Sequence, residues 1–249
     1  ILYINMVKFV EEELQKINSE VLEMWELVLD QMKNVCEAFF TDDKEKAWEV
    51  LIREKRVNAC ETKLDCDIED FMARFNPVAI DLRFTIAMLK IITDLERIGD
   101  FAENIARFII KHEEKYLDDS LLEKTRIREM ADCVVEMLGM SKTAFEERDI
   151  AIAYSLFEKD NVLDEINSAS TDALAQYVGG HNDKLAFCLD FKGVILRLER
   201  AGDHITNLAE EVIFYVNAAV LKHTTDKLGK DKALMHKLRG EDNEQADGC

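Results

Sequence analysis

The chain has 249 residues, a formal net charge of −19, 48% hydrophobic and 33% charged residues, and a single proline. So negative a charge argues against a nucleic-acid surface or a polybasic membrane anchor, and the scarcity of turn residues argues against a sheet protein. No apolar run reaches the roughly 18 residues that a membrane span requires. The composition is typical of long amphipathic helices, in one large domain or two modest ones.

The first half predicts three helices. Apolar residues recur at three- and four-residue steps over residues 9–40, and the segment 41–43 (TDD) then interrupts this pattern and offers a cap for a second helix. The second helix ends before Pro77, which suits the first turn of a third helix that runs to about His112. Trp25 and Trp48 are expected in the core.

The second half repeats this plan. A shift of 106 residues aligns several core and cap residues, such as Met24 with Met130 and Asp43 with Asp149, and the shift falls to 103 by the third helix. The sequence therefore predicts an all-α protein made of two tandem three-helix bundles related by internal duplication, over residues 1–116 and 117–222. The apolar period fades afterwards, which predicts a disordered tail over residues 223–249.

One string of residues is nearly spelled out twice. The pattern L-E-R-x-G-D-x-x-x-N-x-A occupies residues 95–106 and 198–209. It places Glu96 and Asp100, and again Glu199 and Asp203, one helical turn apart on the same side of a helix. Two carboxylates at this spacing repel by a few tenths of a kcal/mol, and the internal glycine costs roughly 1 kcal/mol relative to alanine. Because both destabilising features occur twice in the sequence, they indicate a functional site.

Each half carries a second acidic row on its middle helix. The 106-residue shift aligns Asp160 and Asp164 with Glu54 and Asn58, and Glu61 follows one turn further along. Carboxylate and amide oxygens suit hard or intermediate cations such as Mg²⁺, Mn²⁺ or iron. The rows are therefore predicted to bind metal ions, and the Glu96/Asp100 row is expected in an outer groove or on the surface, away from the dry core. The simpler alternative is that they are solvated helix faces.

Residues beside the acidic rows have structural interpretations. Gly99 and Gly202 are expected to allow the close approach of a neighbouring helix. Arg97 and Arg200 lie about 100° around the helix from the glutamates and could pair with acids of a neighbouring helix. The six cysteines form no C-x-x-C pair and indicate a reduced cytosolic compartment, and the five scattered histidines argue against zinc held by His and Cys.

Together, the doubled E-x-x-x-D row and the string P-V-A-I-D-L-R at residues 77–83 resemble the PhoU family of phosphate-uptake regulators. The likeness covers about residues 9–222. It implies a cytoplasmic, often dimeric protein without catalytic activity. Such proteins damp signalling from a phosphate ABC transporter to a membrane sensor kinase, so that phosphate-starvation genes stay off.

The resemblance also implies multinuclear metal clusters, with iron first and zinc, manganese or magnesium as alternatives. The site residues carried over are Glu54, Asn58, Glu96, Asp100, Asp160, Asp164, Glu199 and Asp203. Asn58 departs from the acidic pattern, which puts full occupancy of the first-half site in question. The P-V-A-x-D-L-R string is missing from the second half, so the two halves are not equivalent.

Two other classes of protein compete with a phosphate-signalling regulator. A ferritin-like di-metal enzyme needs Glu-x-x-His pairs inside a helical bundle, and none of the predicted helices contains one. In the third class, a metal-free helical adaptor, the acidic rows would have no functional role. Metal analysis of protein purified without chelator separates the adaptor from the other two.

Overall fold

The computed structural model describes the backbone of residues 2–112 and 118–241, and the side chains of residues 8–112, 118–181 and 183–217. The described residues form α1 (Leu2–Thr41), α2 (Lys44–Phe75), α3 (Ile80–Lys111), α4 (Asp119–Thr125), α5 (Ile127–Glu147), α6 (Ile150–Gly180), the short 3-10 turn η1 (Asn182–Lys184) and α7 (Leu185–Glu241). The prediction of an all-helical chain is confirmed.

Two equivalent aspartates begin the middle helix of each half. Asp43 accepts a hydrogen bond from the backbone N–H of Lys46 at the start of α2. Asp149 accepts bonds from the N–H groups of Ala151 and Ile152 at the start of α6. Each aspartate satisfies donors that the first turn of a helix leaves without an intrahelical partner. The two caps are separated by the offset that the sequence predicts.

Two helix boundaries differ from the prediction because single residues adopt positive φ. Ala79, with φ at 52°, prevents α3 from starting at Pro77, which lies in the connection instead. Arg126, also with φ at 52°, ends α4 and begins α5 where one continuous helix is expected. The Arg126 guanidinium bonds to Glu129 of α5 and to Glu165 of α6, which holds the break in place. The described residues therefore form seven α-helices where six were predicted.

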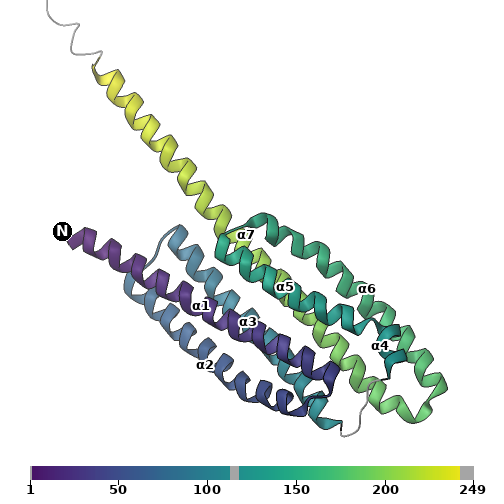
Figure 1. The fold of residues 1–249 in the computed structure, drawn as a ribbon. Coiled ribbons are helices and arrows are strands. Elements are labelled where there is room, and N and C mark those ends of the chain that lie inside the picture. The colour runs from purple at the N-terminus through teal and green to yellow at the C-terminus, as the bar shows by residue number, and fades with distance from the viewer. Residues whose placement is uncertain (1, 113–117, 242–249) are drawn as a thin grey trace, which may run out of the picture.

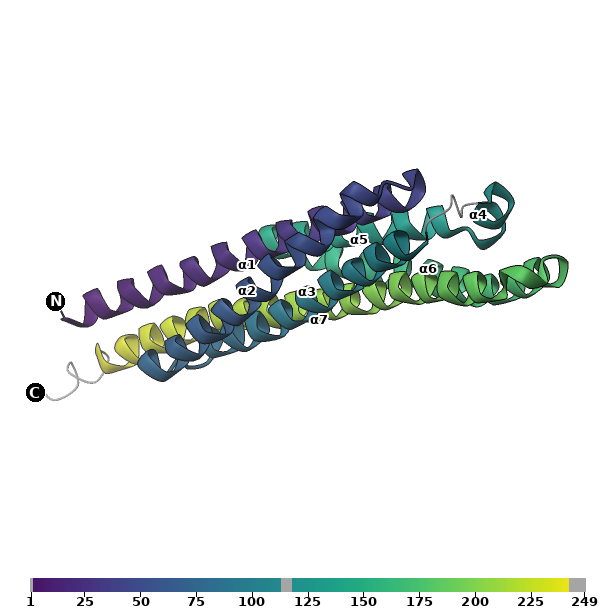
Figure 2. The ribbon, with the colours of Figure 1, turned by 90° about the horizontal axis from the view of Figure 1, so that it is seen from below.

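The two halves share one continuous apolar core. The three long helices of each half pack against one another, but the most extensive contact in the described residues joins α3 to α7 across the halves, and α1 also packs against α5. Figures 1 and 2 show α3 and α7 side by side along the middle of the molecule. These two helices are antiparallel, because Phe84 pairs with Tyr215 and Lys111 pairs with Asp190. The two repeats thus form one structural unit.

The two tryptophans occupy opposite environments. Trp25 of α1 is fully buried, and its ring lies 5.2 Å from that of Phe145 in α5, so it belongs to the shared core as predicted. The prediction that Trp48 is buried is wrong, because its side chain is 54% exposed. The neighbouring Ala47 occupies the inward position of α2, and one helical step of about 100° turns Trp48 outward.

The structure also differs from the prediction of a disordered tail over residues 223–249. The backbone of α7 continues as helix to Glu241, and residues 242–249 lie outside the described residues. The continuation to residue 241 contains no proline, and it includes four lysines and three leucines, which favour helix. None of the described helices has a segment long and apolar enough to cross a membrane.

Candidate functional site

The four carboxylates predicted for the second half lie on two adjacent helices, with Asp160 and Asp164 on α6 and Glu199 and Asp203 on α7. The pKa of Asp160 is raised to about 6, mainly by burial and also by the negative charges of the other three. Because such coupling weakens with distance, these four residues form one acidic cluster, here called the second-half cluster.

The duplicated glycines explain how this proximity arises. A Cβ atom added at Gly202 would lie 2.8 Å from Oδ1 of Asp160 and 2.3 Å from Cδ1 of Leu163. A Cβ atom added at Gly99 would lie 3.0 Å from Oε2 of Glu54. Each glycine therefore leaves room for a carboxylate from the neighbouring helix to lie against its backbone. The prediction that Gly99 and Gly202 allow close helix approach is confirmed.

Glu54 is the most buried of the predicted site residues, at 3% exposure. The amide Nε2 of Gln31 in α1 donates a hydrogen bond of 2.5 Å to its Oε2, whereas its Oε1 is buried without a hydrogen-bond partner among the described residues. The pKa of Glu54 is raised to about 7, mainly by burial and also by the charges of Asp100, Glu103 and Glu96, while the Gln31 bond opposes this shift. Glu54 therefore lies inside the core, whereas the sequence placed the Glu96/Asp100 row outside it.

Two further acids lie with Glu54 in the first half: Glu61, which the sequence placed one turn beyond Asn58 without assigning it as a ligand, and Glu103. Burial raises the pKa of Glu61, and the charge of Glu96 adds to the effect. The negative charge of Glu103 contributes to the raised pKa of Glu54. Each lies seven residues after a predicted ligand on its own helix, a spacing that returns to the same side and could have identified both. The first-half cluster consists of Glu54, Glu61, Glu96, Asp100 and Glu103.

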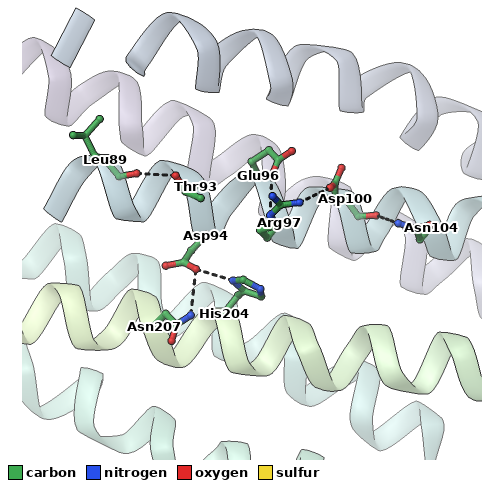
Figure 3. Close-up of polar contacts among 9 residues, drawn as sticks. All are labelled: Leu89, Thr93, Asp94, Glu96, Arg97, Asp100, Asn104, His204 and Asn207. Atoms are coloured by element: carbon green, nitrogen blue, oxygen red, sulfur yellow. Dashed lines mark hydrogen bonds and ion pairs between the residues drawn. The ribbon is translucent and has the colours of Figure 1, made fainter. Parts of the chain in front are cut away.

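Arg97 pairs with carboxylates of its own helix. Its Nε lies 3.6 Å from Oε2 of Glu96, and its Nη1 lies 3.5 Å from Oδ2 of Asp100 (Figure 3). The expectation that Arg97 pairs with a neighbouring helix is therefore wrong, since the carboxylates beside it on α3 are within reach. Asn58, the predicted site residue that is not acidic, is exposed on α2.

The second-half cluster has a lysine beside it that the first half lacks. Nζ of Lys192 donates to the backbone oxygen and Oδ1 of Asn167, each at 2.7 Å, and to Oγ of Ser170 at 2.9 Å. Burial lowers the pKa of Lys192, while the charge of Glu199 opposes this shift. The equivalent residue of α3 is Leu89. The two clusters therefore share their main carboxylates, but only the second-half cluster has this lysine beside it.

A polar seam joins α3 to α7 in the same region. Oδ1 of Asp94 lies 2.7 Å from Nδ1 of His204 and accepts a bond of 3.3 Å from Nδ2 of Asn207 (Figure 3). The charge of His204 also lowers the pKa of Glu96 against the dominant, raising effect of burial. The seam therefore couples α7 to the first-half cluster.

The oxygen atoms of these clusters are of the type that binds hard and intermediate cations, but they do not converge on one point. Among the described residues, no three His, Cys, Asp or Glu side chains are arranged closely enough to hold a metal ion. The groups nevertheless supply carboxylate oxygens that repel one another, and Oε1 of Glu54 is buried with its hydrogen-bonding capacity unused. Oxygen donors of this kind suit hard and intermediate cations, which would offset the repulsion.

These features define a class: a helical protein built from two copies of one three-helix repeat, each with an acidic cluster on its second and third long helices. A family model described as the PhoU domain matches residues 21–109 and again residues 127–212. The matches begin 106 residues apart and end 103 residues apart, the two offsets found in the sequence. The chain belongs to the PhoU family, and the internal duplication is confirmed.

Relatives and solved structures agree with this assignment. The chain is 30% identical over 224 residues to the phosphate-specific transport system accessory protein PhoU homolog of Burkholderia sp, covering 90% of this chain and 95% of the relative. It is 28% identical to the corresponding PhoU protein of Escherichia coli (strain K12), covering 88% of this chain and 92% of the relative. The crystal structure of PhoU from Pseudomonas aeruginosa matches with a TM-score of 0.77 at 30% identity, over 83% of this chain and 98% of that chain. The family consists of accessory regulators, so the prediction that the chain is not an enzyme is confirmed, and the ferritin-like alternative is wrong.

Proposed function

We propose that this protein is an accessory regulator of a phosphate-specific transport system. In this role it damps phosphate-starvation signalling between a phosphate ABC transporter and a membrane sensor kinase. The observation that carries the proposal is the 30% identity to a phosphate-specific transport system accessory protein over nearly the whole of both chains. We further propose that it works in the cytoplasm as a homodimer, as the family resemblance implies.

The carboxylate clusters are proposed to hold metal ions in this regulator. Each cluster draws acids from two helices, and the raised pKa values of Glu54 and Asp160 reflect burial first and the nearby negative charges second, both of which a bound cation would offset. The proposed ions are iron first, then zinc, manganese or magnesium. Asn58 contributes an amide in place of a carboxylate, and Glu61 and Glu103 supply additional oxygens to the first half.

A metal-free adaptor is the second candidate, and the absence of a converged ligand group among the described residues favours it. Elemental analysis of protein purified without chelator separates the two candidates. Bound metal that falls on Asp160→Asn and Glu199→Gln substitution supports the metal sites. Protein that is free of metal, or a metal content unchanged by these substitutions, supports the adaptor.

The regulatory role is tested in the cell of origin by deleting the gene and following a phosphate-starvation reporter such as secreted alkaline phosphatase. In phosphate-rich medium the deletion strain should express the reporter, and the wild-type gene in trans should silence it again. A reporter that stays silent in the deletion strain, with normal induction on phosphate starvation, would contradict the proposed role.

A further inference from the structure

Helices α6 and α7 are connected through η1 at one end of the molecule (Figures 1 and 2). An apolar groove lies between these two helices. Its volume is about 390 Å³, and it is lined by Thr171, Leu174, Ala175, Val178, Leu185, Cys188, Leu189 and Lys192. Leu185 is 51% exposed and Leu189 is 66% exposed. Such exposure of large apolar side chains at the mouth of an apolar groove is typical of a binding surface.

The groove leads along α7 into the second-half cluster. The residues that follow Leu185 at steps of four and three are Leu189, Lys192, Leu196, Glu199 and Asp203, which therefore lie along one side of the helix. Leu196 is also exposed, at 41%. The amine of Lys192 is bound by Asn167 and Ser170 of α6, so its charge is already partnered. The row spans roughly 27 Å, the length of a helix of about 18 residues.

The first half provides an internal comparison. At the positions equivalent to Thr171 and Ala175, α2 carries Asp65 and Glu69, and at the position equivalent to Leu196, α3 carries Thr93. Carboxylates at these positions would oppose the burial of an apolar side chain. The apolar character is therefore a property of the second repeat and not of the shared three-helix plan.

We infer that this groove docks an amphipathic helix of a partner protein. The apolar side chains of that helix enter the groove beside Leu185 and Leu189, and in the metal-free protein its basic residues lie against Glu199 and Asp203. A groove between two packed helices accepts a third helix through apolar residues spaced one turn apart. The negative charges at one end select a basic partner, whereas a second copy of this chain would bring its own carboxylates against them. The inference rests on the proposed role as a regulator that acts by binding partners, and it names the chemistry of one such partner.

The test uses the full-length protein in chelator at physiological salt, with a fluorescent 18-residue helical peptide that carries leucines on one face and lysines on the other. The peptide should bind wild type, and Leu189→Glu or Ala175→Glu should weaken binding at least tenfold. Ile86→Glu, the change in α3 that matches Leu189→Glu, should leave affinity within about twofold. The double variant Glu199→Gln/Asp203→Asn should weaken binding and reduce its salt dependence.

The inference is overturned if the peptide fails to bind, or if Leu189→Glu and Ile86→Glu weaken its binding equally. It is also overturned if Leu189→Glu dissociates an oligomer in sedimentation, because a second copy then covers the groove. Circular dichroism melts that match wild type verify that each variant is folded. Since the peptide assay needs no phosphate signalling, its failure would leave the role tested by the reporter intact.

Discussion

The first-half and second-half clusters arose by duplication of one sequence, but they differ in how they bury charge. In the first half, Glu54 lies inside the core with Gln31 as its hydrogen-bond partner. In the second half, Asp160 is shorter and partly exposed, and the position equivalent to Gln31 is the apolar Met137. A duplicated site can therefore keep its glycine and its carboxylates while its supporting residues diverge. This difference implies that the two clusters respond unequally to mutation, pH and metal.

The largest effect on stability is expected from a mutation in the shared core. Trp25→Ala removes a fully buried ring that contacts Phe145 of the other half, so it should cost roughly 3–5 kcal/mol of unfolding free energy. Because the core is continuous, both halves should unfold in one transition, as followed by urea denaturation. Trp48→Ala, at an exposed position, is the control and should change stability by less than about 0.5 kcal/mol. Separate transitions for the two halves would show that the repeats are independent.

The raised pKa of Glu54 predicts that the free energy of unfolding depends on pH, and we expect a weaker dependence from the second half. Its folded-state pKa, about 7, lies above the ordinary 4.5, so its contribution to stability is fully present below pH 4.5 and is lost as the pH rises through 7. In chelator, Glu54→Gln should therefore be more stable than wild type at pH 8 by roughly 1–3 kcal/mol, and this advantage should shrink toward pH 5. Urea denaturation at both pH values measures it. Parallel pH profiles for the two proteins would mean that Glu54 is not held in a desolvated site.

The two glycines should respond unequally to alanine. At Gly202 the new methyl group would overlap the buried Leu163, so overpacking should exceed the gain in helix propensity and leave a net loss of about 1–2 kcal/mol. At Gly99 the nearest atom is a carboxylate oxygen of Glu54, which can move, and the net change should stay within about 0.5 kcal/mol. Thermal melts of both variants give the comparison. Equal losses would indicate that α2–α3 and α6–α7 are packed equally tightly.

The smallest expected effect concerns Asn58. Asn58→Asp makes the first half match the second, which has Asp164 at this position, and adds a charge one turn from Glu54. In chelator the added repulsion should cost a few tenths of a kcal/mol. If the first half binds metal, the same change should raise metal affinity, as measured by titration calorimetry. An affinity that stays the same or falls would place Asn58 outside the site.

The fold was predictable where local pattern determines it. Helix type, the aspartate caps at Asp43 and Asp149 and the 106-residue duplication all follow from spacing along the chain. The break at Arg126 did not, because the partner that supports it, Glu165, lies on another helix. The outward position of Trp48 was missed because residue type was given more weight than the helical period that buries Ala47.

The candidate site was predictable in its residues more than in its surroundings. The repeated string identified the carboxylates and glycines that the structure brings together around α6 and α7. It could not indicate that Gln31 of α1 reaches Glu54, since that contact joins residues from separate helices. The sequence also did not indicate that the two bundles share one core. The apolar residues of α3 contact both α1 and α7, and the sequence pattern does not separate these two contacts.

The acidic clusters are proposed to bind metal, and the most direct test of this is the sign of one stability change. Thermal melts compare wild type with Asp203→Asn, each in chelator and with Mn²⁺ or iron added. In chelator the variant should be as stable as wild type or slightly more stable, because carboxylate repulsion is relieved. With metal it should be less stable, because an ion that binds only the folded state stabilises wild type more. If the two proteins shift in parallel under every condition, Asp203 is not a metal ligand, and the clusters are solvated faces of a helical adaptor.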